Sequence, residues 1–299
     1  MNQLSYFTYT RHLLKVLTLL LIAGCGTTST SVETASDRAD RVLFEEYSYS
    51  GVSLDISNET DNARATTWRP DGSKIFITGR YTENVVSYTM TEPWDIGTAT
   101  FSGEYDLSNE FGSTSQISVA HGLFLHDGGE LMWVFNRTEI WGYTLETPWE
   151  LSTAVQTSYF DLQDFVQRGH DFDFNPDGTK LFIDDRDAQA VHEVHLATPW
   201  DITTIEWEYT LDISDQEKEV RGLEMVKGGT IMLLMDTVRQ EILQYALSEP
   251  YNLSTARYLN AFDVSEQAVQ PRGLSVHPDL KYIYVTGRDN QKIYRYERR

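Results

Sequence analysis

The chain is short of cysteine, of positive charge and of long apolar runs, and each shortage excludes a class of protein. Cys25 is the only cysteine in 299 residues, so no disulfide can form within one molecule. Lysine and arginine number 24 against 45 acidic residues, and a net charge of −21 disfavours binding to nucleic acid or anionic lipid. The most apolar stretch, residues 13–23, is too short to span a bilayer.

The N-terminus has the pattern of a processed targeting segment. Arg11 and Lys15 lie at the start of the apolar stretch, which ends in Ile22-Ala23-Gly24-Cys25. This tetrapeptide resembles the lipobox of bacterial lipoproteins, which implies cleavage before Cys25 and acylation of its sulfur. We expect three segments: a signal peptide at 1–24, a lipidated cysteine and polar tether at 25–42, and a folded domain at 43–299.

These features predict a protein of the bacterial cell envelope that is held at the membrane by its lipid alone. By resemblance to lipoproteins of Gram-negative bacteria, Gly26 after the cysteine favours the outer membrane. We expect the folded domain to be monomeric and to bind no nucleic acid.

A segment of about ten residues recurs along the chain. It reads TEPWDIGTAT at 91–100 and returns at 146–155, 197–206 and 248–257. Its prolines are 55, 51 and 51 residues apart, a period typical of propeller blades.

Each repeat is predicted to contain four short strands. Asp71-Gly72 and Asp177-Gly178 are tight-turn signals between runs of β-branched and aromatic residues, which indicates a hairpin. A third strand follows each hairpin. A fourth strand follows the proline segment and carries a recurrent aspartate: Asp55, Asp106, Asp161, Asp212 and Asp263.

The order of strands at the two ends predicts how the repeats close. The first strand, near 46–56, is of the aspartate-bearing type, and the chain stops directly after a third strand. We therefore predict an all-β fold, a five-bladed β-propeller of four-stranded blades whose ring is closed by the N-terminal strand. An open β-solenoid or a pair of sandwiches is the alternative.

The hairpins also resemble a known group of bacterial repeats. Pro70-Asp71-Gly72 with Ile75 to Gly79, and Pro278-Asp279 with Tyr282 to Gly287, are similar to the YVTN and lactonase-like propeller superfamily. The resemblance implies the fold, and that group includes lactonases, scaffolds and proteins of unknown role.

Aligning the five hairpins on their turns reveals a column of basic side chains, which we call the inner column. Its members are Arg64, His121, His170, Arg221 and Arg272. Arg168 could replace His170 if that strand contains a bulge. Such a column predicts a site for an anionic ligand at the channel mouth, with guanidinium groups binding carboxylate or sulfate. Histidines of ordinary pKa would strengthen that binding as the pH falls from about 8 to 6.

A second column at the same end of the hairpins, the outer column, is also basic. It comprises Arg80, Arg137, Arg186, Thr237 and Arg288. Four nearby acids, Glu83, Glu139, Asp187 and Asp289, could neutralise it as interblade ion pairs. Both columns could therefore be inherited framework rather than a binding site.

Carboxylates supply the enzymatic alternative. Asp171, Asp173 and Glu224 are predicted to lie on inner strands near the channel, where they could hydrolyse a glycan or a lactone. Metal ligation has little support, because His192 and His195 are three residues apart on a strand and point to opposite faces. The aromatic residue of each proline segment is expected to wedge into its blade edge rather than stack on a sugar.

The sequence therefore favours a binding or scaffold module over an enzyme, with no cofactor. Its expected partner is an anionic glycan or an envelope protein with an acidic surface. A structural subunit of an envelope assembly complex is a further alternative, supported by fold analogy only.

Overall fold

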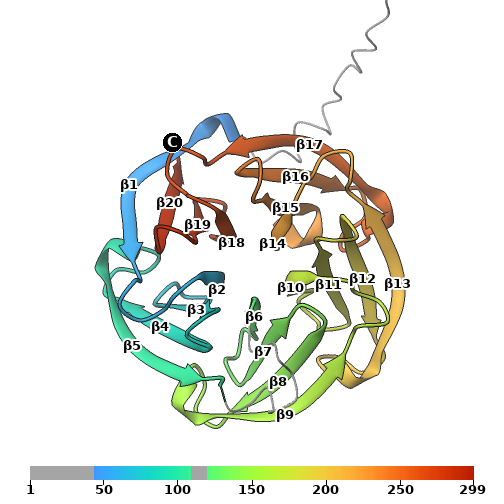
Figure 1. Cartoon of the computed structure of the whole chain (residues 1–299), viewed down its shortest axis with the longest axis horizontal. Coiled ribbons are helices and arrows are strands. Elements are labelled where there is room, and N and C mark those ends of the chain that lie inside the picture. The colour runs from blue at the N-terminus through green and yellow to red at the C-terminus, as the bar shows by residue number, and fades with distance from the viewer. Residues whose placement is uncertain (1–43, 109–119) are drawn as a thin grey trace, which may run out of the picture.

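The computed structural model describes residues 44–108 and 120–299, which form a ring of antiparallel sheets around a central axis (Figure 1). There are five sheets of four strands each, so the predicted all-β, five-bladed β-propeller is confirmed. Cys25 and the tether at 25–42 lie outside the described residues, and their roles stay predictions. None of the described helices, which are turns of three residues, could cross a membrane.

Each blade is built from strands that are consecutive in the chain, except where the ring closes. The first blade contains β2 (Ala63–Trp68), β3 (Lys74–Gly79), β4 (Asn84–Met90) and β5 (Ala99–Asp106). The second contains β6 (Gly122–Leu125), β7 (Leu131–Asn136), β8 (Glu139–Leu145) and β9 (Ala154–Asp161). The third contains β10 (Gly169–Phe174), β11 (Lys180–Asp185), β12 (Ala190–Leu196) and β13 (Ile205–Asp212). The fourth contains β14 (Val220–Val226), β15 (Ile231–Asp236), β16 (Glu241–Leu247) and β17 (Ala256–Asp263). The fifth contains β18 (Pro271–Val276), β19 (Tyr282–Gly287), β20 (Lys292–Arg298) and β1 (Tyr47–Asp55).

Short 3-10 turns precede the first strand and connect several of the others. They are η1 (Phe44–Glu46), η2 (Ile96–Thr98), η3 (Leu151–Thr153), η4 (Ile202–Thr204), η5 (Lys227–Gly229) and η6 (Leu253–Thr255).

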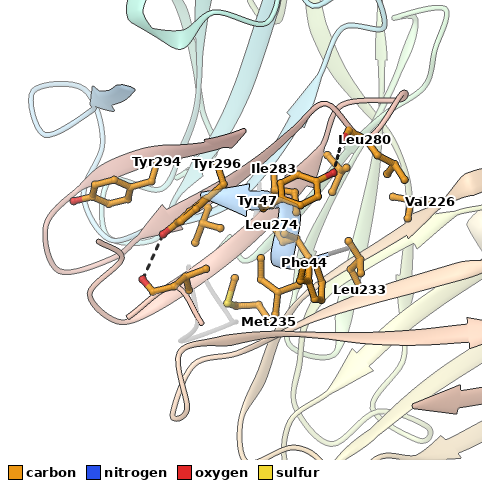
Figure 2. Close-up of a cluster of buried hydrophobic side chains, with 14 of the residues drawn as sticks. Phe44, Tyr47, Val226, Leu233, Met235, Leu274, Leu280, Ile283, Tyr294 and Tyr296 are labelled. Carbon is orange, nitrogen blue, oxygen red and sulfur yellow. Dashed lines mark hydrogen bonds between the residues drawn. The ribbon is translucent and has the colours of Figure 1, made fainter. Parts of the chain in front are cut away.

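The N-terminal strand closes the ring, as the sequence predicts. β1 pairs antiparallel with β20, with Tyr47 opposite Arg298 and Asp55 opposite Lys292. Phe44 and Tyr47 are buried in the hydrophobic cluster between the fourth and fifth blades (Figure 2). The Tyr47 hydroxyl donates a hydrogen bond to the Leu280 carbonyl. The first and last segments of the fold therefore share one core.

The recurrent aspartate ends each outer strand. Its carboxylate accepts the backbone N–H two residues further on, at distances from 2.7 Å for Asp263 to 3.0 Å for Asp55. This local hydrogen bond turns the chain inward, toward the first strand of the next blade.

The proline segments wedge into the blade edges, as expected. Trp94, Trp149, Trp200 and Tyr251 all have positive φ, between 56° and 68°. Each ring covers the glycine of its hairpin turn; at Gly72, for example, an added Cβ would lie 2.2 Å from Trp94. These aromatic rings therefore hold the hairpin turns in place.

Candidate anion site

Four of the five inner-column residues lie at irregular positions in the first hairpin of their blade, and His121 directly precedes β6. In β2 the pairing passes from Ala63 opposite Gly79 to Thr66 opposite Ile77, which leaves Arg64 as the first of two residues outside the regular register. The pairings of β10, β14 and β18 shift at the same place. His170, Arg221 and Arg272 thus occupy equivalent bulges, and the interpretation that placed Arg168 in the column is not needed.

The five innermost strands approach one another closely at this end. β2, β6, β10, β14 and β18 each contact two neighbours in a closed ring. The Ala65 N–H donates to the His121 carbonyl of the next blade at 3.2 Å. A Cβ added to Gly273 would lie 2.1 Å from the Arg64 carbonyl oxygen. This spacing brings the inner-column side chains of adjacent blades together.

The resulting electrostatic field is positive. Burial lowers the pKa of Arg64, and Arg272, Arg80, Arg221 and Arg288 lower it further, to about 7. A guanidinium keeps its proton in folded proteins. The lowered pKa of Arg64 therefore means that its positive charge is unfavourable at this position without a counter-ion. Burial, and then Arg221 and Arg288, also lower the pKa of Arg272, to about 9.

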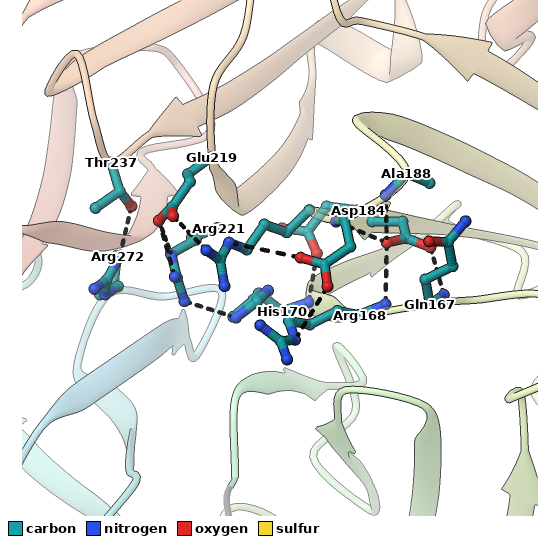
Figure 3. A network of polar contacts seen from close by, with 12 residues as sticks. Gln167, Arg168, His170, Asp184, Ala188, Glu219, Arg221, Thr237 and Arg272 are labelled. Carbon is teal, nitrogen blue, oxygen red and sulfur yellow. Dashed lines mark hydrogen bonds and ion pairs between the residues drawn. The ribbon is translucent and has the colours of Figure 1, made fainter.

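Part of the positive charge is balanced within the fourth blade (Figure 3). Glu219 accepts two hydrogen bonds from Arg221, at 3.2 and 2.9 Å, and pairs with Arg186. Arg272 donates to the hydroxyl of Thr237 at 2.8 Å and to the Gln270 side chain at 3.1 Å, and neither of these partners is charged.

Other side-chain nitrogens in the inner column have no partner among the described residues. They are Nε and Nη1 of Arg64, both ring nitrogens of His121, Nδ1 of His170 and Nε of Arg272. Arg64 and Arg272 are each 3% exposed and His121 is 1% exposed. Buried N–H groups nearly always bind something, so these atoms favour an acceptor outside the described residues.

His121 and His170 form a contacting pair inside this field. Their ring centroids are 4.6 Å apart with an angle of 82° between the planes. Nη1 of Arg221 lies 2.7 Å from Nε2 of His170. Because a guanidinium can only donate, Nε2 must accept, which makes His170 neutral with its proton on Nδ1.

Both histidines differ from the expectation based on an ordinary pKa. Burial lowers the pKa of His121 well below 6.5, and Arg64, Arg80 and Arg137 lower it further. Burial lowers that of His170 in the same way, with His121 and Arg221 the next contributors. In the free protein both imidazoles therefore bind a proton more weakly than an ordinary histidine, which argues against the expected gain of positive charge between pH 8 and 6.

The outer column is only partly neutralised. Arg288 pairs with Asp289 at 2.6 Å, and Arg186 lies 3.8 Å from Asp187. Arg80 and Arg137 make no ion pair within the described ranges, and the Glu139 carboxylate instead accepts from the Tyr159 hydroxyl. Two outer arginines thus have no counter-ion among the described residues.

The carboxylates of the enzymatic alternative also converge. Asp171 accepts the Leu223 N–H at 3.2 Å, and Asp173 accepts the Met225 N–H at 2.8 Å, so both link the third blade to the fourth. Asp171, Asp173 and Glu224 line one small central cavity. Burial raises the pKa of Asp173 to about 7 and that of Glu224 well above its usual value.

A larger cavity lies nearby, at the hairpin-turn end. It measures about 230 Å³, and Asp127, Asp173 and Glu224 line it together with Phe124 and Trp200. No three metal-ligating side chains come together in the parts of the chain that are described.

Sequence reasoning missed two acids beside the inner column. Glu219 lies two residues before Arg221, directly ahead of β14, and this closeness in sequence could have identified it as the counter-ion. Asp184 accepts the backbone N–H groups of His170 and Asp171, at 2.5 and 2.9 Å, and only the fold brings these residues together.

Neither a family model nor a curated protein sequence matches this chain. Solved structures resemble it at low identity. A protein of unknown function from Desulfotomaculum acetoxidans is 13% identical, with 75% of this chain and 62% of that one covered and a TM-score of 0.43. A Bacteroides uniformis protein proposed to be a 6-phosphogluconolactonase is 12% identical, with 77% and 65% covered and a TM-score of 0.47.

A Lactobacillus plantarum protein is similar at the same level, with 11% identity, 79% and 67% of the two chains covered and a TM-score of 0.49. This chain thus spans less than two thirds of the length of the first two relatives. Likeness at this level concerns the fold alone, and no activity follows from it.

Proposed function

We propose that this propeller is a binding module for an anionic ligand, an acidic glycan or an acidic peptide, held at the mouth formed by Arg64, His121, His170, Arg221 and Arg272. The observation that carries the proposal is Arg64, a buried guanidinium with two donor atoms that no described residue accepts. An anion with several oxygens would accept these hydrogen bonds and reduce the repulsion among the arginines.

Substitution of two arginines tests the proposal. Arg64→Gln combined with Arg272→Gln should weaken binding of a sulfated disaccharide or a glutamate-rich peptide by tenfold or more, because each charged hydrogen bond contributes about 1.5–3 kcal/mol. Arg69→Gln is the matched control, since Arg69 is 43% exposed and paired with Asp71 at the hairpin-turn end. Titration calorimetry at two salt concentrations provides the measurement, and wild-type affinity should fall with added salt.

Equal affinities for the wild type and the double variant would show that the cationic mouth does not bind these ligands. So would wild-type affinity that is unaffected by salt. Circular dichroism melting of each variant separates loss of binding from loss of fold.

The carboxylate cavity supports a second candidate, hydrolysis of a glycan or lactone. Asp173, with its pKa raised to about 7, could act as a general acid near neutral pH, and Trp200 and Phe124 provide apolar walls. The interblade hydrogen bonds of Asp171 and Asp173 favour a structural role instead. Turnover of chromogenic glycosides or lactones that is lost in both Asp173→Asn and Glu224→Gln would establish the enzyme.

We also propose that Cys25 anchors this domain in the bacterial envelope through lipid. Cys25→Ser should abolish palmitate labelling and move the protein to the soluble fraction. Removal of residues 1–24 takes away Arg11 and Lys15 and no acid, so 22 cations remain against 45 acids, and a body of net charge −23 has no evident affinity for anionic lipid. Persistence of the variant in the membrane fraction would contradict the anchor.

A further inference from the structure

We propose that the mouth takes up a proton together with its anion, and that the His121–His170 pair is the group that accepts it. This inference rests on the proposed function, because it concerns the same site. It names the ligand class as a multivalent oxyanion, such as a sulfate or phosphate ester. A monovalent carboxylate would balance too little of the charge at this mouth.

The first observation is the hydrogen-bonding capacity of the pair. Both nitrogens of His121 and Nδ1 of His170 lack partners among the described residues. Only Nε2 of His170 is engaged, as the acceptor from Arg221. His121 therefore has one ring nitrogen free to take a proton without breaking any hydrogen bond within the described protein.

The second observation is the set of charges that face the pair. The cations come from the first blade (Arg64, Arg80), the second (Arg137), the fourth (Arg221) and the fifth (Arg272). Two acids of the third blade, Asp171 and Asp184, lie close by, but both accept backbone N–H groups. Burial raises the pKa of each, which disfavours the charged form of both carboxyls.

Burial and positive neighbours together keep the pair neutral in the free protein. An oxyanion among Arg64, Arg272 and His121 would reverse the sign of the nearest field and favour imidazolium. The coupling is reciprocal, since a ligand that favours the protonated pair must bind more tightly when the pair is protonated. Binding should then strengthen as the pH falls, although burial and the arginines disfavour protonation of both histidines in the free protein.

Calorimetry with inorganic sulfate tests this inference, because sulfate does not itself titrate between pH 5 and 8. Binding is measured at pH 6 in buffers of different ionisation enthalpy, which gives the number of protons taken up. We expect uptake of a substantial fraction of one proton at pH 6, and affinity that rises by up to about tenfold per pH unit on acidification. Acetate in place of sulfate should bind far more weakly and without proton uptake.

His121→Gln is the decisive variant, because glutamine can still hydrogen-bond to the anion but cannot be protonated. It should bind sulfate with no proton uptake and with little pH dependence. His126→Gln is the matched control, since His126 lies in the β6–β7 turn at the far end of the same hairpin and packs on Trp200, and it should leave uptake unchanged.

The outcomes separate the two proposals. Sulfate binding that is lost in Arg64→Gln, but that shows no proton uptake in the wild type, would overturn this inference and leave the anion site standing. Uptake that persists in His121→Gln and in His170→Gln would also overturn it. The absence of any binding of sulfate, phosphate or their esters would overturn both.

Discussion

At the scale of single residues, Glu217 is a buried acid outside the candidate site. Glu217 is fully buried, and neither of its carboxylate oxygens has a partner among the described residues. Its backbone N–H donates to Ile213, and the equivalent N–H groups in three other blades belong to Thr60, Val166 and Ala268. Glutamate thus stands where other blades have a small or apolar residue.

The pKa of Glu217 gives the direction of a stability change with pH. Burial, and then the nearby Asp236 and Asp184, raise it from 4.5 to about 8. A raised pKa in the folded state means that Glu217 is tolerated best when protonated. Its stabilising contribution is complete below about pH 4.5 and is lost as the pH rises to about 8.

Glu217→Val should therefore remove this pH dependence. Compared with the variant, the wild type should lose at least about 1 kcal/mol of unfolding free energy between pH 5 and 8.5, because an uncompensated buried charge is costly. Urea denaturation at both pH values provides the measurement. Glu266→Gln, at an exposed position of the corresponding fifth-blade loop, is the control. Parallel pH profiles for wild type and Glu217→Val would contradict the assignment.

A glycine on an inner strand makes a second prediction at this scale. Gly273→Ala places a methyl group 2.1 Å from the Arg64 carbonyl and should destabilise the fold by roughly 2 kcal/mol or more. Gly103→Ala, on the outer strand β5, meets nothing closer than 3.4 Å and should change stability by less than about 0.5 kcal/mol. Similar melting temperatures for both variants would mean that the inner strands can move apart.

The residue patterns identified which residues form the two columns, but not the protonation or the hydrogen bonds of those residues. The inner column could be recognised in the sequence because the bulges, as at Arg64 and Arg272, begin at the same distance from the hairpin turn. The neutral state of His170 could not be predicted from the sequence, because it depends on a contact with Arg221, which is 51 residues away. The hydrogen bonds that tie Asp171 to Leu223 were hidden for the same reason.

At the scale of elements, β1 is the strand whose removal should matter most. Deleting residues 26–41 should leave stability unchanged, whereas deleting 26–57 removes β1 together with Phe44 and Tyr47. The second deletion exposes the edge of β20 and opens the cluster shown in Figure 2, so we expect aggregation or a large fall in melting temperature. Two truncated proteins with the same melting temperature would contradict closure by β1.

Strand order was the most predictable property of this chain. Each element carries its own signal: Asp71-Gly72 at a hairpin turn, Asp55 at the end of an outer strand and Pro93 in the edge turn. Because these signals repeat in phase, the number of blades and the closing strand could be counted. The cavities could not be predicted from the sequence, because they depend on how side chains such as Phe124 and Trp200 pack between blades.

At the scale of the whole molecule, an acidic protein has seven of its arginines in the inner and outer columns, at one end of its axis. The chain carries 17 arginines against 45 acids. Even so, Arg64, Arg80 and Arg221 lie close enough for each to lower the pKa of His121. The surrounding negative surface would repel most anions, so a ligand of this site must be held by direct contacts with these arginines.

Crystals of residues 43–299 grown with selenate test this account most directly, because selenium can be located by its anomalous scattering. The account predicts a selenate ion within hydrogen-bonding distance of Nε or Nη1 of Arg64, with Arg272 and His121 as further donors. Selenate found only on the outer surface, with the Arg64 donors bound to water alone, would contradict the anion site.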